Sequence, residues 1–76
     1  MSKDDILERI GLNITMIREK RGLTQEELGA LAGLHGAYIG QIERGEKNIG
    51  LRNLQKIAKA LKVSVRVLVD TLNVDR

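Results

Sequence analysis

The stretch LTQEELGALAGLHGAYIGQIERG, residues 23–45, decides the fold of this chain. Its first part predicts a short helix that begins after Thr24, because threonine is a good N-cap and Glu27 follows at the spacing of a capping box. Gly33 stands where such a helix needs a left-handed residue to end. We therefore expect one short helix between Thr24 and Gly33.

The second part of the stretch predicts another helix, over about residues 35–44. Leu34 and Ile39 flank His35 at the spacing of a hydrophobic staple, so the helix is expected to begin at His35 or at the next residue. Two short helices joined by a sharp glycine turn have the layout of a DNA-binding helix-turn-helix, here over about residues 24–44.

Periodicity predicts three further helices around this motif, and hence an all-α fold of five helices. A helix over about residues 3–20, capped by Ser2, would place four isoleucines on one face: Ile6, Ile10, Ile14 and Ile17. Another helix is expected over about residues 51–61. The segment 63–69 alternates like a strand, but Ser64 as a cap favours a helix over about 64–73.

Composition excludes several classes of function. The chain has 76 residues, which is the size of one domain, 1–76. It has no cysteine and one histidine, so neither a disulfide framework nor a metal site is expected, and we expect no cofactor. The first residues are charged, which predicts neither a signal peptide nor a membrane span and fits a cytoplasmic protein. The net charge of +3 suits a polyanionic partner.

Many positions fall in register with one family: Ile14, Ile17 and Arg18, the run from Gly22 to Leu28, Gly33, Leu34 and Ile39, the run from Ile42 to Gly45, and Leu54, Ile57, Ala58 and Leu61. With them the chain resembles the lambda-repressor-like helix-turn-helix family, of the XRE or Cro/C1 type, over roughly residues 10–72. Its short form, with Tyr38 inside GLHGAYIGQIERGEKNI, is most similar to controller proteins of restriction–modification systems. The resemblance implies a compact lambda-repressor-like domain and a transcription regulator that binds double-stranded DNA.

Outward residues of the second motif helix are the expected base-reading set. Gln41 comes first, because its amide can pair bidentately with adenine, although a solvated glutamine is the alternative. Ala37 can touch a thymine methyl group, while Gly36 offers only backbone and favours readout of DNA shape. His35 can cap the helix, contact a phosphate or read a base. Gly40 either lets the backbone approach DNA or relieves packing between the two helices.

Residues around the motif are expected to contact DNA phosphates: Thr24, Gln25, Tyr38, Arg44, Lys47 and Asn48. Gln25 lies in the first turn of its helix, where its side chain and nearby N–H groups can hold a phosphate, and the resemblance gives the matching glutamine this role. The resemblance also implies a DNA-backbone contact for Tyr38, with a half-buried core tyrosine as the alternative. Solvated loop charges are the alternative for Arg44, Lys47 and Asn48.

Other charged residues are assigned structural roles. The resemblance implies a partly buried salt bridge between Arg18 and Glu43, which keeps both residues off the base-reading set. Lys56, Lys59 and Lys62 are interpreted as a solvated face.

The last predicted helix carries more apolar side chains than one small core needs. Such a patch indicates an interface, so we expect a two-fold homodimer through Val65, Val67, Leu68, Val69 and Leu72, with Ile49 and Leu51 beside them. Two copies would then reach half-sites about 34–36 Å apart on DNA. The alternative is that the same side chains complete the core of a monomer.

The sequence features described above are compatible with two functions. The first is a sequence-specific transcription regulator that occupies a palindromic operator and either blocks RNA polymerase or activates it by contact. The second is an antitoxin-like protein-interaction module on the same fold. A salt titration separates them, because phosphate-driven binding weakens steeply with salt. No motif for an enzyme is present: there is no phosphate loop, GxSxG or HExxH spacing.

Overall fold

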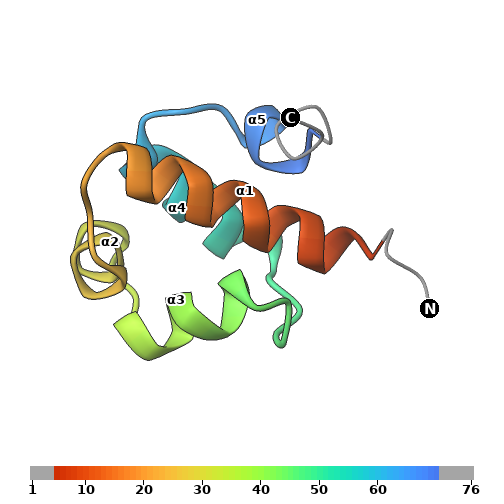
Figure 1. The fold of residues 1–76 in the computed structure, drawn as a ribbon, viewed down its shortest axis with the longest axis horizontal. Coiled ribbons are helices and arrows are strands. Elements are labelled where there is room, and N and C mark those ends of the chain that lie inside the picture. Colours follow the sequence, from red (N-terminus) through yellow and green to blue (C-terminus); the bar gives the residue numbers. More distant parts are fainter. Residues whose placement is uncertain (1–4, 71–76) are drawn as a thin grey trace.

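A computed structural model describes residues 5–70 of the chain, and within this range it forms helices joined by short loops, without strands. The helices are α1 (Ile6–Lys20), α2 (Gln25–Ala32), α3 (Gly36–Glu43), α4 (Leu51–Leu61) and α5 (Val65–Val69). Figure 1 shows α1 across the middle of the molecule, with α5 above it and α3 along the opposite edge. The expected all-α fold of five helices is confirmed. None of the helices described is long and apolar enough to cross a membrane.

Capping chemistry sets the ends of α2 as the sequence predicts. The Thr24 hydroxyl accepts a hydrogen bond from the Glu27 N–H at 3.0 Å, and the Glu27 carboxylate accepts one from the Thr24 N–H at 2.9 Å. Gly33 ends the helix with φ of 73°, in the left-handed region where a Cβ would be strained. These local contacts place the start of α3 only a few residues after α2.

Other helix ends differ from the prediction. Helix α1 begins at Ile6 rather than Lys3, because the Asp5 side chain accepts a hydrogen bond from the Leu7 N–H and provides the cap. The expected cap, Ser2, lies outside the described residues. His35 and Ser64 stand at the N-caps of α3 and α5, yet neither side chain makes a capping hydrogen bond. Helix α5 ends at Val69, short of the predicted residue 73, and residues 71–73 lie outside the described range.

The hydrophobic core lies between the helices and draws on all five of them. Helix α2 contacts α3 and α4, while α1 contacts α3 and α5. The side chains that are buried most completely are aliphatic, apart from one asparagine: Ile14, Leu28, Ile39, Ile42, Ile57, Leu61, Leu68 and Asn13. Ile10 and Ile14 of the predicted isoleucine face are buried, but Ile6 is 48% exposed because it stands at the first turn of α1, beyond the core.

Asn13, a buried residue of α1, holds α5 against α1 through hydrogen bonds. Its amide nitrogen donates hydrogen bonds to the Leu68 carbonyl at 2.8 Å and to the Asp70 carbonyl at 2.9 Å. These carbonyls belong to the end of a short helix, where backbone acceptors lack partners within the helix itself. The buried asparagine therefore caps the C-terminal end of α5, a role that was not predicted from the sequence.

Gly11 allows α1 to approach the end of α3 closely. A Cβ atom at this position would overlap the carbonyl oxygens of Ile42 and Glu43, and these are backbone atoms that cannot move aside easily. Because α3 carries the expected base-reading residues, this contact helps to fix its position against the rest of the fold.

Candidate nucleic-acid interface

One side of α3 packs into the core, and its opposite side is open. Ile39 and Ile42 are 0% and 1% exposed, whereas Ala37 and Arg44 are exposed and Gln41 is half-buried. In Figure 1, α3 lies along the lower edge of the molecule and the other helices lie on one side of it. The outer side of α3 is therefore free to meet a ligand as large as a DNA duplex.

A buried ion pair holds the C-terminal end of α3. The Arg18 guanidinium on α1 donates to the Glu43 carboxylate through Nε at 2.6 Å and through Nη2 at 3.1 Å. Its Nη1 also donates to the Leu23 carbonyl, in the loop before α2, at 2.7 Å. The Arg18 side chain is 12% exposed and that of Glu43 5% exposed. The hydrogen bond to Glu43 raises the pKa of Arg18 above its ordinary value, so this cation stays charged.

Gln25 extends this network to α2. Its amide nitrogen donates to the Glu43 carboxylate at 2.9 Å, so Glu43 is bound both by α1 and by the first turn of α2. Gly40 is buried beside this amide: a Cβ there would lie 3.2 Å from Gln25 Oε1 and 3.3 Å from Arg44 Nη1. Of the two roles open for Gly40, the structure favours packing between α2 and α3. The network fixes the tilt between the two helices of the motif.

The expected base-reading residues differ in their exposure and in their contacts with the rest of the chain. Gln41 and Ala37 lie on the open side of α3, and no residue among 5–70 hydrogen-bonds the Gln41 side-chain amide. His35 is exposed at the N-cap, with a side chain that makes no capping bond. Gly36 presents only backbone, and a Cβ there would lie 2.8 Å from Glu26 Cγ and 2.9 Å from Glu26 Cα. Its side-chain direction thus faces α2, and the residue serves the contact between helices.

Tyr38 joins the core with its ring and keeps its hydroxyl group at the edge. The ring packs against the core cluster, and the Tyr38 Oη accepts a hydrogen bond from Asn53 Nδ2 on α4 at 2.9 Å. An accepting hydroxyl still has its own proton to donate, so Asn53 leaves the group able to bind an outside acceptor such as a phosphate oxygen. Asn53 was not among the predicted site residues. The available signal was an asparagine inside a helix, where this residue is unfavourable without a specific partner.

Arg44 is held by a carboxylate two residues away. Its Nε donates to Glu46 at 2.8 Å and its Nη2 donates to the same carboxylate at 3.2 Å. Both side chains are more than half exposed. The hydrogen bond raises the pKa of Arg44 and lowers the pKa of Glu46, so both groups stay charged near neutral pH. The two N–H directions used by Glu46 are the ones that a phosphate would use.

Replacing Glu46 with glutamine is therefore expected to tighten binding to duplex DNA by about two- to fivefold, because Arg44 no longer has to exchange partners. Fluorescence anisotropy with a labelled duplex measures this change. Glu26→Gln, on the first turn of α2, is the matched control that removes an exposed carboxylate without an arginine partner. The extra gain at position 46 should disappear in an Arg44→Ala background. An equal gain from both glutamine variants would show a general charge effect instead.

The other expected phosphate contacts, Thr24, Lys47 and Asn48, are all exposed. The Thr24 hydroxyl already accepts the capping bond, and its proton remains available to an outside acceptor. Residues 5–70 hold no group of three or more histidine, cysteine, aspartate or glutamate side chains placed to bind a metal ion. The open face therefore offers hydrogen-bond donors and positive charge.

The expected dimer residues divide into two groups. Leu68 is fully buried and Ile49 is 9% exposed, so both belong to the core of one chain and have little surface to give a partner. They pack inward because α5 and the loop before α4 close over the same core. Leu51 is 78% exposed, and the α5 valines are half-buried: Val65, Val67 and Val69. Leu72 lies outside the described residues.

Comparison with known proteins identifies the family. A helix-turn-helix family model matches residues 14–68. The control protein C.SmaI of Serratia marcescens is 44% identical over 61 residues, which cover 80% of this chain and 73% of that protein. The crystal structure of the restriction–modification controller protein C.AhdI from Aeromonas hydrophila is 40% identical, with a TM-score of 0.80, over 82% of this chain and 94% of that one.

One of the similar solved structures contains DNA. The P22 c2 repressor, crystallised with a synthetic operator, is 32% identical to this chain with a TM-score of 0.76. The match covers 82% of this chain and 94% of the repressor chain. The outer side of α3 is open and has hydrogen-bond donors around it. Together with this geometry, the comparisons show that the chain belongs to the XRE-type helix-turn-helix family and is a DNA-binding transcriptional regulator.

Proposed function

We propose that this chain is the controller of a restriction–modification system, which binds a palindromic operator as a two-fold homodimer and thereby times expression of the endonuclease. The observation that carries the proposal is the open side of α3, whose tilt is fixed by the buried Arg18–Glu43–Gln25 network. The proteins similar to this chain include several restriction–modification control proteins.

In this proposal α3 lies in the major groove with its N-terminal part toward the bases. Gln41 reads an adenine through its amide, and Ala37 contacts a thymine methyl group. Phosphate contacts on both sides of the groove set the register of the helix without reading sequence. Their donors are Gln25, Tyr38, Arg44, Lys47 and Asn48, with Thr24 and His35 at the N-terminal ends of α2 and α3.

The dimer of this proposal uses the apolar residues that remain on the surface. Leu51 and the half-buried valines of α5 support such a contact, because burying a leucine that is 78% exposed removes apolar surface from water. Two recognition helices about 34–36 Å apart would read half-sites one turn apart. From such a site the dimer would block RNA polymerase or activate it by direct contact.

Selection of bound sites from random duplex DNA tests the proposal as a whole. A palindrome with half-sites one helical turn apart is the expected result, and analytical ultracentrifugation should show a dimer. Binding should also weaken steeply as salt rises, because phosphate contacts release counterions. A single unrepeated half-site, or binding insensitive to salt, would contradict the dimeric operator-binding protein proposed here.

Gln41→Ala is expected to weaken operator binding by about 1–3 kcal/mol and to relax the preference at one base pair, because a bidentate base contact is lost. Lys47→Ala, on an exposed loop residue, is the matched control that should weaken binding to every sequence alike. Anisotropy measurements on the operator and on single-substitution duplexes separate the two patterns. If both variants lose affinity without regard to sequence, Gln41 does not read a base.

A further inference from the structure

The positive charge of the chain is concentrated in its last third. Between positions 47 and 69 there are six lysines and arginines and no acidic residue, while all ten acids lie elsewhere in the chain. Three of these cations, Lys56, Lys59 and Lys62, come from α4 and its C-cap. None of the three belongs to the proposed DNA contacts, so the proposed binding of DNA does not account for their positive charge.

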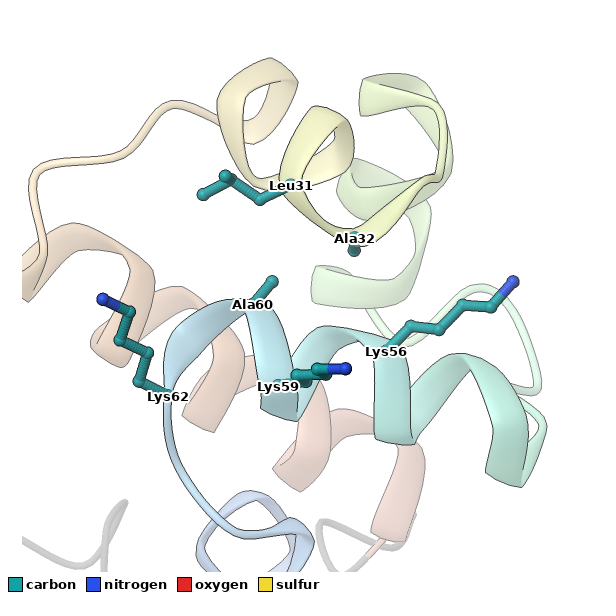
Figure 2. A pocket seen from close by; sticks show the side chains of 6 residues that line it. All are labelled: Leu31, Ala32, Lys56, Lys59, Ala60 and Lys62. Atoms are coloured by element: carbon teal, nitrogen blue, oxygen red, sulfur yellow. The ribbon is translucent and has the colours of Figure 1, made fainter.

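These lysines border an apolar groove between α2 and α4. The groove has a volume of about 380 Å³ and is lined by Leu31, Ala32, Lys56, Lys59, Ala60 and Lys62. Figure 2 shows Leu31 and Ala32 on α2 facing the side of α4 that carries Ala60, with the three lysine side chains spread along α4. Leu31 is 62% exposed, although the neighbouring Ala32 is 8% exposed. The groove thus combines an apolar floor with a cationic rim.

No anion within the described part of the chain neutralises this rim. None of the three groove lysines takes part in an ion pair with another residue among 5–70. Helix α4 has no acidic residue that could pair with them at a spacing of three or four. The rim is therefore complementary to an acidic partner.

The apolar floor distinguishes a protein partner from nucleic acid. A DNA backbone could neutralise the lysines, but its phosphates and sugars would leave the exposed Leu31 without an apolar partner. An amphipathic helix with leucine-like side chains on one face and carboxylates beside them satisfies both parts of the groove. This mode, in which an amphipathic helix lays its apolar face in a groove, recurs in peptide recognition.

We infer that the α2–α4 groove is a docking site for an acidic amphipathic helix of a partner protein. The apolar face of that helix covers Leu31, Ala32 and Ala60, and its carboxylates meet Lys56, Lys59 and Lys62. Because none of these residues belongs to the proposed DNA contacts, the site can be occupied while the protein is bound to its operator. Docking would then bring the partner to the DNA site.

A titration of the full ¹⁵N-labelled chain with a synthetic helical peptide tests this inference. The peptide carries leucines on one face, glutamates on both flanks and neutral residues elsewhere; a second peptide has lysine in place of each glutamate. Amide shifts should change around the groove with the acidic peptide only. Lys59→Glu should weaken that binding by about tenfold, because like charges then meet across the contact, and Leu31→Gln should weaken it as well.

Lys20→Glu is the matched control, since Lys20 is an exposed lysine at the end of α1 and does not line the groove. It should leave peptide binding unchanged, and Lys59→Glu should leave operator binding within about twofold of the wild type. Thermal melts of each variant check the fold. Shifts elsewhere on the chain, or equal binding by Leu31→Gln and wild type, overturn the inference. A loss of operator affinity in Lys59→Glu, without specific peptide binding, would assign the lysines to flanking DNA.

Discussion

Replacing Arg18 with methionine is expected to lower the free energy of unfolding by about 3–5 kcal/mol. Methionine keeps much of the volume of the side chain but leaves the Glu43 carboxylate, which is 5% exposed, without its cation. One hydrogen bond from Gln25 remains and cannot offset a buried charge. Urea denaturation followed by circular dichroism measures the loss.

Two further variants show that the loss comes from the stranded charge. Arg18→Met combined with Glu43→Gln removes both charges and should recover much of the stability, because exchanging a whole buried pair costs less than breaking it. Arg44→Met breaks the exposed pair with Glu46 and should leave stability almost unchanged. Equal losses of stability from Arg18→Met and Arg44→Met would contradict a stabilising role for the buried Arg18–Glu43–Gln25 network.

The contribution of Arg18 should not vary with pH near neutrality. The folded protein raises the pKa of Arg18 above its ordinary value, so the stabilisation is fully present below the ordinary arginine range. It is lost only as the pH rises through the raised pKa of the folded state. A change in the stability of the wild type near neutral pH must therefore come from other groups.

Asn13→Asp is expected to lower the free energy of unfolding by at least about 3 kcal/mol. The amide nitrogen of Asn13 donates to the carbonyls of Leu68 and Asp70, and the side chain is fully buried. A carboxylate of the same shape has no proton for either carbonyl and places a charge beside two acceptor oxygens. The end of α5 should detach first, which hydrogen exchange at its amides would detect.

Asn48→Asp makes the same chemical change at an exposed residue and should alter stability by less than about 0.5 kcal/mol. Burial raises the pKa of a carboxyl group, so part of the loss in Asn13→Asp should disappear progressively as the pH falls from the raised pKa of the folded state to about 4, below which the acid is neutral in both states. Equal stability of the two variants would mean that Asn13 does not fasten α5.

Local signals in the sequence were sufficient for the motif. The capping box of Thr24 and Glu27 and the left-handed Gly33 act within a few residues, so their geometry follows from backbone chemistry alone. The start of α1 was predicted too early because Asp5, a cap as good as Ser2, stands closer to the apolar face. Capping preference alone does not choose between two good candidates.

Roles that depend on distant partners could not be read in the same way. Gly36 and Gly40 look equally permissive in sequence, yet the structure places one against Glu26 and the other beside Gln25 and Arg44. Glu46 gave no sign that it would hold Arg44. Leu68 shares the apolar character of the α5 valines, and only packing shows that it belongs to the core.

The sequence by itself determined the helix-turn-helix and the all-α class, because caps, glycine turns and apolar periodicity act over one or two turns of chain. Tertiary structure alone decided that Asn13 caps α5, that Asn53 orients Tyr38, and that Leu31 lines a groove bordered by lysines. Each of these roles joins residues far apart in the chain. Their energies arise from burial and from partners that come within reach only when the helices pack together.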